Sequence, residues 1–285
     1  MDAVIFLPMS TNKEHTRAAP AAFPGLDFIY RSSGDGVDEN LLVLFHGMGD
    51  LPANFIQFAV KMNLPQTALL ALKAPFPVPF HEGTCWAPVY DYDGNEHPPS
   101  SPIMRQAVVK TRNLVSDFLS QRVLAPADTP SNERRLWPAR NVFLLGFSQG
   151  GAAAMDVALF GSLGGGSSSA TPLPPLGGTI SISGWPSRAS YAGSPLPKVN
   201  AGQKILVTQG DRDDICKNWK SEAEFWKRTI ASNGQLAVQI IPGKGHSMPT
   251  GAVEMRAIMS FLGPNLVLRN LALESMADVY EVKTS

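Results

Sequence analysis

The amino-acid sequence predicts an α/β fold, with a mostly parallel central sheet and helices on both of its faces. Short apolar runs rich in β-branched residues alternate with longer segments of helical period, which is the pattern of strands joined by helical crossovers. The 285 residues are 44% hydrophobic and 17% charged, which excludes wholesale disorder and allows one large core. Because α/β sheets often reach about 250 residues as one unit, we expect a single domain over residues 1–285.

Seven short apolar segments are predicted to be strands, and several are apolar enough to be buried on both faces. Their residue ranges are 27–31, 41–45, 68–72, 142–145, 179–183, 205–208 and 237–241. Between them, five segments carry apolar residues at helical spacing, namely 53–62, 102–119, 149–160, 218–231 and 250–262. Right-handed crossovers then place layers of helices over both faces of the sheet.

Four further segments are irregular. The glycine- and proline-rich stretch 161–178 and the stretch 125–140 are both expected to be solvent-facing loop insertions. The stretch 73–101 mixes prolines with aromatic residues, which predicts an ordered apolar wall. The extension after residue 263 is expected to dock on the core or to pair with another chain.

The charge balance argues against a nucleic-acid partner. The chain has 24 Lys and Arg against 24 Asp and Glu, so its formal net charge is zero. No overall positive field then gathers phosphates or anionic lipids.

Cysteine content and apolar runs suggest the compartment. The two cysteines, Cys85 and Cys216, are too few for a framework of several disulfides, and we expect both to be free thiols. The apolar stretch 3–9 is short and lacks a preceding basic region, unlike a signal peptide. No run approaches the roughly 20 apolar residues that cross a bilayer. We therefore expect a cytoplasmic protein without a transmembrane segment.

One serine lies in a turn that is typical of nucleophiles. The strand 142–145 runs into Gly146-Phe147-Ser148-Gln149-Gly150 and then into a helix of small residues. Glycines two positions on either side of Ser148 let strand and helix approach each other, and the turn strains the serine backbone. Its Oγ is predicted to project at the carboxyl edge of the sheet. The alternative is a glycine-flanked turn serine without chemistry.

A serine hydroxyl needs a histidine to take its proton, and that histidine needs a carboxylate to orient it. In a strand-turn-helix context of this kind the chain order is serine, acid, histidine. Of the five histidines only His246 follows Ser148, in a loop just after the last predicted strand. We expect His246 to be the base rather than an ordinary surface histidine.

The acid must lie between Ser148 and His246. Four aspartates lie in this interval: Asp156, Asp211, Asp213 and Asp214. Asp156 is two turns along the helix after Ser148, so it is expected to point away. The other three follow the strand 205–208 at a carboxyl edge, and spacing alone does not choose among them. The two glutamates of the amphipathic helix that follows are expected to be solvated: Glu222 and Glu224.

A second turn is placed to stabilise an oxyanion. The strand 41–45 ends in His46-Gly47-Met48-Gly49-Asp50, a glycine-rich turn that can present a backbone N–H toward the serine. Together with the N–H of Gln149 it would form an oxyanion hole. His46 and Asp50 are expected to brace this loop through hydrogen bonds rather than to act in catalysis.

These motifs together resemble the phospholipase/carboxylesterase family of α/β-hydrolases, which includes acyl-protein thioesterases. The resemblance covers roughly residues 41–262. It rests on FHGMGD (45–50), GFSQGGAAAM (146–155), SGWPSRAS (183–190), QGDRDD (209–214) and GKGHS (243–247). It implies the α/β-hydrolase fold.

The resemblance also assigns roles. It selects Asp213 as the acid, beside Ser148 as nucleophile and His246 as base, and it names the N–H groups of Met48 and Gln149 as the oxyanion hole. The chain departs from the family pattern at three positions of one motif, with Gln209 in place of the usual His, Asp214 in place of Pro, and Cys216 at its end.

Candidate substrate contacts come from the stretch 73–101, which we call the aromatic loop. Trp86 and Tyr90 fall where the family has a tryptophan and an aromatic residue near the acyl site. Phe76 in the same loop and Trp185 in SGWPSRAS are further candidates. Plain hydrophobic packing of a long loop is the alternative.

The expected activity is a serine hydrolase that cleaves acyl esters or thioesters through an acyl-enzyme, with no metal and no organic cofactor. Acyl-protein thioesterase or carboxylesterase is the leading assignment, and lysophospholipase or small-ester carboxylesterase is the alternative. A hydrolase-like module that binds an acyl group or peptide without catalysis is an alternative of another class. The expected substrate partner is an acylated small molecule, lipid or lipidated protein, and homodimerisation is one further expectation.

Overall fold

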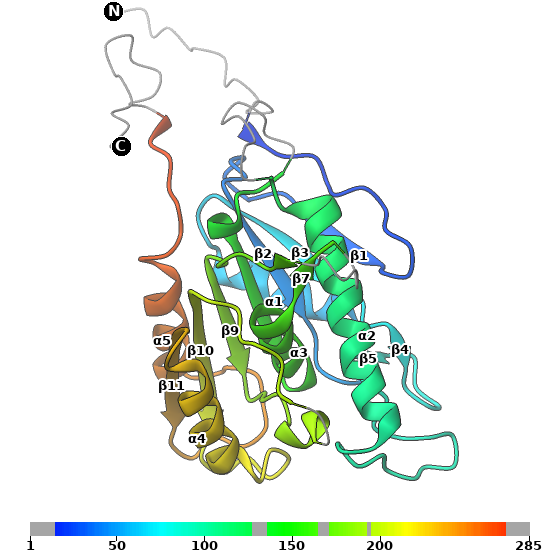
Figure 1. Cartoon of the computed structure of the whole chain (residues 1–285). Coiled ribbons are helices and arrows are strands. Elements are labelled where there is room, and N and C mark those ends of the chain that lie inside the picture. Colours follow the sequence, from blue (N-terminus) through cyan, green and yellow to red (C-terminus); the bar gives the residue numbers. More distant parts are fainter. Residues whose placement is uncertain (1–14, 127–135, 165–170, 193–194, 272–285) are drawn as a thin grey trace, which may run out of the picture.

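The computed structural model describes residues 15–126, 136–164, 171–192 and 195–271. In this part of the chain the central sheet has seven strands in the order β1-β3-β2-β6-β9-β10-β11 (Figure 1). Their bounds are β1 Phe28–Arg31, β2 Asn40–Phe45, β3 Thr67–Leu72, β6 Val142–Phe147, β9 Gly178–Ile182, β10 Gln203–Gly210 and β11 Gly234–Ile241. Strand β1 is antiparallel to β3, and all other neighbours are parallel.

All seven predicted strands are present, with ends that differ by a few residues. The central strands β2 and β3 are buried at every position, because helices cover them on both faces. Strand β2 pairs in register with both neighbours, and Leu41 lies opposite Ala68 on one side and Val142 on the other. The fold is therefore the predicted α/β-hydrolase architecture.

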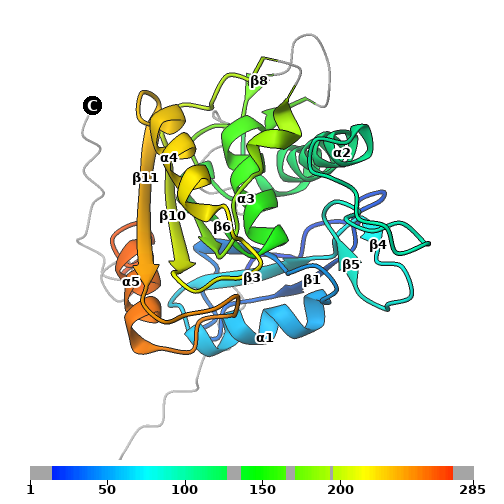
Figure 2. The same cartoon turned by 90° about the horizontal axis from the view of Figure 1, so that it is seen from below.

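The five predicted helices are also present. They are α1 Pro52–Met62, α2 Pro102–Phe118, α3 Gln149–Phe160, α4 Trp219–Ile230 and α5 Ala252–Leu262. Helices α2, α3 and α4 cover one face of the sheet, and α1 and α5 cover the other (Figure 2). Within the described residues, no helix is long and apolar enough to cross a membrane.

Alternation along the strands builds a core on each face. In β2, Leu41, Val43 and Phe45 point into the core shared with α2 and α3. The residues between them, Leu42 and Leu44, point into the core under α1 and α5. Because successive side chains of a strand point to opposite faces, one strand contributes residues to the cores on both faces of the sheet.

Part of the stretch 161–178 is not the solvent-facing loop that its composition predicts. Strand β7 (Ser162–Leu163) pairs with β8 (Thr171–Pro172), and Leu173 and Leu176 lie in the core. Leu173 and Leu176 hold this part of the stretch against the core, because burying each leucine side chain contributes about 2 kcal/mol. Residues 165–170 of the stretch lie outside the described residues.

Part of the stretch 125–140 is also buried instead of facing solvent. Trp137 is fully buried and exchanges backbone hydrogen bonds with Val123 and Ala125. It follows the π-helical turn η2 (Leu119–Val123) and precedes the 3₁₀ turn η3 (Ala139–Asn141). Residues 127–135 lie outside the described residues.

The other two segments agree with their predictions in part. The stretch 73–101 holds the hairpin of β4 (Phe76–Pro77) and β5 (Thr84–Cys85), and it is buried at residues 83–87 but mostly exposed from residue 90 to residue 100. The extension after 263 docks on the core, because Asn40 exchanges side-chain hydrogen bonds with the backbone of Val267, and Gln66 does so with Arg269. The part of the extension beyond residue 271 lies outside the described residues.

Candidate active site

Ser148 lies in a strained turn between β6 and α3. Its φ of 53° and ψ of −122° place a non-glycine residue in a backbone region that L-residues rarely adopt. The flanking glycines make the turn sterically feasible. A Cβ on Gly146 would lie 2.3 Å from the carbonyl oxygen of Gly150, and one on Gly150 would lie 2.2 Å from that of Phe45. The sequence therefore forces the serine into this conformation at the carboxyl edge of the sheet.

Three side chains that are distant in sequence meet at this edge. The Oγ of Ser148 lies 2.7 Å from His246 Nε2. On the other side of the ring, His246 Nδ1 lies 2.9 Å from Asp213 Oδ2 and 3.1 Å from Oδ1. A carboxylate only accepts, so Nδ1 carries the proton and Nε2 is free to accept from the serine hydroxyl.

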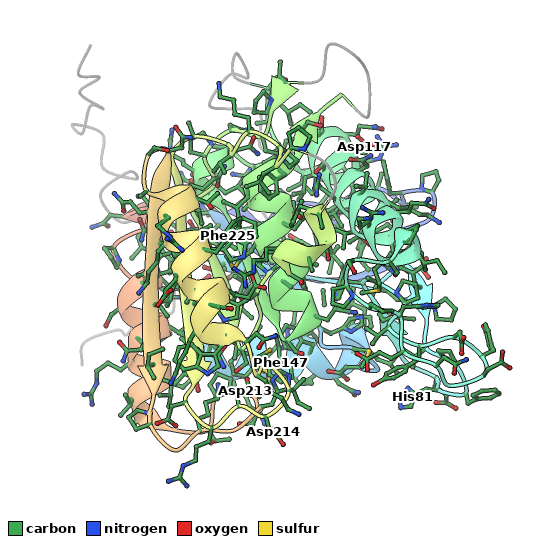
Figure 3. All side chains as sticks on the ribbon, turned by 60° about the horizontal axis from the view of Figure 1, so that its bottom comes forward. His81, Asp117, Phe147, Asp213, Asp214 and Phe225 are labelled. Carbon is green, nitrogen blue, oxygen red and sulfur yellow. The ribbon has the colours of Figure 1, made fainter. Side chains whose placement is uncertain are left out.

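The other acidic candidates are not in contact with this histidine. Asp211 is exposed and accepts a hydrogen bond from the Gly243 N–H, and Asp214 is exposed. In Figure 3, Asp213, Asp214 and Phe147 lie at the same end of the molecule. Glu224 is exposed as expected, but the solvation predicted for Glu222 was wrong. That side chain is half-buried, and burial raises its pKa.

Asp213 is held by three donors besides the histidine. Its Oδ1 accepts from the N–H groups of Ile215 at 3.0 Å and Cys216 at 2.8 Å, and its Oδ2 accepts from Gln209 Nε2 at 2.9 Å. Burial alone would raise the pKa of Asp213. The hydrogen bonds from the Cys216 N–H, His246 and Gln209 outweigh burial, so this pKa lies below its ordinary value.

The loop that carries His246 rests on a buried ion pair that sequence reasoning missed. Lys244 Nζ lies 2.6 Å from Glu254 Oε1, and Thr208 Oγ1 donates to the same oxygen at 2.6 Å. The Lys244 carbonyl also accepts from the Arg212 N–H at 3.0 Å. A signal was present, because Glu254 precedes the buried Ile258 by four residues and so falls on the apolar face of the predicted helix 250–262.

His46 and Asp50 brace the first turn, as predicted. The Nδ1–H of His46 donates to the Gly47 carbonyl at 2.7 Å, and its Nε2 accepts from the Ala74 N–H at 3.2 Å. Burial lowers the pKa of His46, which keeps it in this neutral form. Asp50 accepts from the Leu51 N–H at 2.8 Å.

The two predicted oxyanion donors lie beside the serine. Gln149 is the first residue of α3, so its N–H has no acceptor within the helix. Its side chain ties the aromatic loop in place, accepting from the Trp86 N–H and donating to the Ala87 carbonyl, each at 2.7 Å. Met48 lines the same cavity as Ser148 and Gln149. Their role toward an oxyanion remains a prediction.

A cavity of about 380 Å³ opens beside Ser148. Its lining is mostly apolar and comes from the aromatic loop, α2, α3 and the segment after β9. Apolar members include Trp86, Ala87, Val89, Tyr90, Met104, Val108, Ala152, Ala153, Trp185, Pro186 and Ile215. Three of the four predicted substrate contacts, Trp86, Tyr90 and Trp185, are among them.

Phe76, the fourth predicted contact, does not line this cavity. Residue 76 is in β4, opposite Cys85, and its ring packs against the buried cluster of Ala87, Met104 and Ala107. Lys110 Nζ lies 5.2 Å from the centre of the ring. Phe76 therefore supports the cavity wall from behind.

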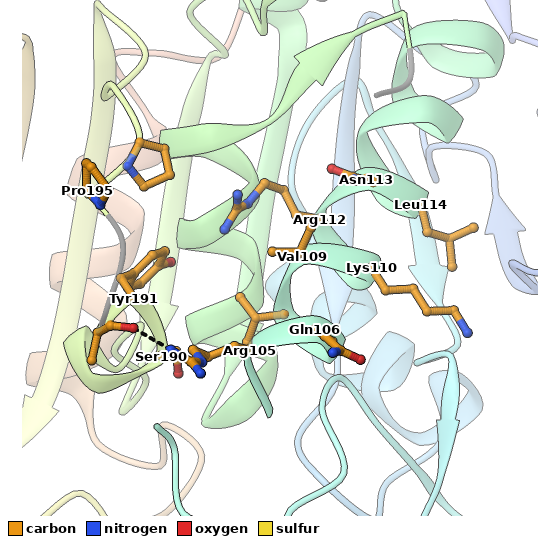
Figure 4. Close-up of a pocket in the computed structure, with 13 residues that line it drawn as sticks. Arg105, Gln106, Val109, Lys110, Arg112, Asn113, Leu114, Ser190, Tyr191 and Pro195 are labelled. Atoms are coloured by element: carbon orange, nitrogen blue, oxygen red, sulfur yellow. Dashed lines mark hydrogen bonds between the residues drawn. The ribbon is translucent and has the colours of Figure 1, made fainter. Parts of the chain in front are cut away.

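A buried ion pair lies against the same cavity. Asp156 lines the cavity together with Ser148, and it bonds to Arg112 through two contacts of 2.7 and 3.0 Å. The Tyr191 hydroxyl also donates to Asp156. Tyr191 and Arg112 face a second hollow of about 960 Å³ between α2 and the turn η4 (Arg188–Tyr191), shown in Figure 4. Sequence reasoning did not find this pair.

Within the described residues, Asp213, Cys216 and His246 form a cluster whose ligand-type atoms lie within 4.8 Å of one another. All three already have protein partners, since the Cys216 thiol donates to the Ser183 carbonyl at 3.2 Å. Burial, and then the charge of Asp213, raise the pKa of this thiol to about 12. Both cysteines are free, as predicted.

The sheet order and the strained serine turn define an α/β-hydrolase. The chain belongs to the phospholipase/carboxylesterase family of hydrolases, because the model of that family matches residues 32–266.

Two curated relatives are named only as uncharacterized hydrolases. A hydrolase of Mycosarcoma maydis is 32% identical over 171 residues, which are 59% of this chain and 56% of that protein. A hydrolase of Schizosaccharomyces pombe is 24% identical over 121 residues, 41% of this chain and 44% of that protein. The chain thus spans about half the length of the curated relatives it matches.

Solved structures share the fold at low identity. Esterase PE8 has a TM-score of 0.63 at 22% identity, covering 85% of this chain and 99% of its own. Acyl-protein thioesterase 2 of Zea mays has a TM-score of 0.57 at 19% identity, with the same two coverages. At such identities the likeness establishes the fold alone.

Proposed function

We propose that this protein is a serine hydrolase that cleaves carboxylic esters or thioesters of acyl groups. The observation that supports it is the hydrogen-bonded chain of Ser148, His246 and Asp213, with the serine in a strained turn that exposes its Oγ beside an apolar cavity. Strained backbone is retained where the surrounding structure imposes it, and such sites are often functional.

In the acylation step, His246 Nε2 takes the Ser148 proton as Oγ attacks the acyl carbonyl. The bond from Oγ to carbon forms, and the carbonyl electrons move onto oxygen. The N–H groups of Met48 and Gln149 then stabilise the oxyanion. The oxyanion then re-forms the carbonyl as the bond to the leaving oxygen or sulfur breaks, and His246 gives its proton to that alcohol or thiol. In deacylation His246 takes a proton from water, which attacks the acyl carbon, and the proton returns to Ser148 Oγ as its bond to the acyl carbon breaks.

Asp213 stabilises the imidazolium that forms twice in each cycle. Its hydrogen bond to Nδ1 also keeps His246 in the tautomer whose Nε2 can accept a proton. Because its pKa lies below the ordinary value, the carboxyl group is ionised at neutral pH. None of these steps requires a metal or an organic cofactor.

The cavity suggests where the acyl group binds. Trp86, Tyr90 and Trp185 offer it an apolar wall next to Ser148. An acyl-protein thioesterase or carboxylesterase is the leading assignment, and a lysophospholipase or small-ester carboxylesterase is the alternative. The corresponding substrates are acylated small molecules, lipids or lipidated proteins. A cytoplasmic location and a homodimer remain part of the proposal, and the two free thiols fit a reducing compartment.

Covalent labelling tests the proposal. A fluorophosphonate should label the folded wild-type protein at one site and should not label Ser148→Ala. A folded wild type that is neither labelled nor active on a short p-nitrophenyl ester would favour the hydrolase-like binding module. Matched oxygen esters and thioesters, from acetyl to palmitoyl, then separate the assignments by kcat/KM. Equal values across both series would remove the thioesterase assignment.

A further inference from the structure

Gln209 lies at the carboxyl end of β10 with no exposed surface. Its side-chain amide joins two groups of the proposed site. The Nε2 donates to Asp213 Oδ2 at 2.9 Å, and the Oε1 accepts from the Trp185 indole Nε1–H at 2.9 Å. Trp185 lines the substrate cavity, and Asp213 holds the histidine. Gln209 therefore bridges the cavity wall and the acid.

The chemistry of its neighbours allows only one orientation of this amide. An indole N–H only donates and a carboxylate only accepts, so the amide oxygen must face Trp185 and the amide nitrogen must face Asp213. The second hydrogen of Nε2 points to the Gly210 carbonyl at 3.1 Å. A flipped amide would break all three contacts, and an unsatisfied buried polar group is costly. The amide is thus fixed.

The oxygen that Gln209 holds is the one nearer to the histidine. Asp213 Oδ2 lies 2.9 Å from His246 Nδ1, compared with 3.1 Å for Oδ1. The other oxygen is held by two backbone N–H groups, those of Ile215 and Cys216. Without Gln209 the carboxylate keeps one anchored oxygen and gains freedom to rotate the other away from the imidazole.

We propose that Gln209 is a positioning residue of the proposed hydrolase. It fixes Asp213 Oδ2 against His246 and links that oxygen to Trp185, so that the substrate wall and the acid are held as one rigid unit. The proposal rests on the proposed function, because it needs Ser148, His246 and Asp213 to act together. Gln209 touches no substrate and acts only through these neighbours.

The effect on pH dependence has a definite sign. The Gln209 N–H holds Asp213 Oδ2 against the imidazole. Loss of this donor lets that oxygen rotate away and weakens the attraction between Asp213 and protonated His246. The acidic limb of the kcat/KM profile should then move to lower pH.

Few titratable groups surround Asp213 in the part of the chain that the structure describes. There, His246 and the neutral thiol of Cys216 are the titratable groups that face it. The Lys244–Glu254 pair lies beneath the histidine loop with its charges paired. The neighbouring charged residues are exposed: Asp211, Arg212 and Asp214.

The test compares Gln209→Met with a matched control on the same strand. Gln203 is also buried in β10, and its amide also bonds at both ends, donating to the Pro174 carbonyl at 3.1 Å and accepting from the Leu176 N–H at 3.4 Å. Gln203→Met should reduce stability and leave the pH profile unchanged. Gln209→Met should lower kcat/KM for a short ester by up to about 100-fold and move the acidic limb to lower pH.

Trp185→Phe provides a second variant that breaks only the other end of the bridge. It keeps an aromatic wall and deletes the Nε1–H that fixes the amide oxygen. It should move the acidic limb in the same direction by a smaller amount, and it decides the matter if Gln209→Met does not fold. Unchanged pH profiles in the folded variants would overturn the proposal. If the folded wild type is not labelled by a fluorophosphonate at all, the proposed function itself is refuted.

Discussion

Two aspartates of this chain are buried to a similar degree but have different hydrogen-bond partners. Asp156 is 3% exposed and Asp213 is 6% exposed. Asp156 meets the guanidinium of Arg112 through two short contacts and also accepts from Tyr191. Asp213 meets neutral donors from Gln209, Ile215 and Cys216, together with one imidazole.

The two aspartates differ in whether the positive charge beside them is permanent. Arg112 carries its charge at every pH at which the protein folds, and the charge of Asp156 raises its pKa further against the effect of burial. The Asp156 carboxylate is therefore compensated at all times. Among the described residues no lysine or arginine pairs with Asp213. In the proposed mechanism its charge stays available for the imidazolium that forms during a catalytic cycle.

The largest expected effect is on activity at Asp213. Asp213→Asn should lower kcat by about 10⁴-fold, because an amide can donate to His246 Nδ1 and thereby favour the wrong tautomer. Steady-state kinetics on a short ester measure the loss, and circular dichroism should show that the variant stays folded. Asp211→Asn and Asp214→Asn are matched controls two residues and one residue away, and both should retain most activity. A severe loss in Asp214→Asn instead would contradict the assignment of the acid.

The second effect is on stability at Asp156. Arg112→Met leaves this carboxylate buried without its cation, which should lower the free energy of unfolding by about 3–5 kcal/mol. Urea denaturation measures the change. The folded fraction should still be labelled by a fluorophosphonate at Ser148, since Arg112 contacts no member of the proposed triad. A loss below about 1 kcal/mol would show that the pair is not the structural element its geometry suggests.

A double variant sharpens this result. Arg112→Met combined with Asp156→Leu replaces the pair by apolar side chains and removes the uncompensated charge. Such replacements are often neutral or stabilising. We expect the double variant to be more stable than Arg112→Met alone.

The two aspartates also mark what the sequence can and cannot predict. The serine turn is a local pattern, and His246 follows from chain order, so the amino-acid sequence alone locates both. The choice among Asp211, Asp213 and Asp214 depended on a family resemblance, because only the path of one short loop decides which carboxylate faces the imidazole.

The Arg112–Asp156 pair gave no comparable signal. Its members lie 44 residues apart on two helices, and although Asp156 falls within the apolar stretch of α3, nothing in the sequence identifies its partner. Their contact exists only because α2 and α3 pack side by side on the sheet. Phe76 shows a related limit, since an apolar ring in a long loop can face the cavity or the core, and sequence does not distinguish them.

A smaller effect concerns acid stability. The pKa of folded Asp213 lies below its ordinary value of about 3.9. Its ionised form therefore stabilises the native state above that pH, and the contribution is lost as the pH falls through the lower, folded-state pKa. Urea midpoints from pH 3 to 7 should show the wild type losing its advantage over Asp213→Asn toward the acidic end. A constant difference across this range would mean that Asp213 gains nothing from its donors.

The smallest expected effect is the absence of thiol reactivity beside Asp213. Burial raises the pKa of Cys216 to about 12 and that of Cys85 to about 11, so at pH 8 only a minute fraction of either is thiolate. Iodoacetamide at that pH should leave the activity of the folded protein intact, whereas both thiols should react in urea. Inactivation that follows alkylation of Cys216 would show that this thiol is ionised. Asp213 would then face a second negative charge instead of only neutral donors and a histidine, and the contrast with Asp156 would need a different explanation.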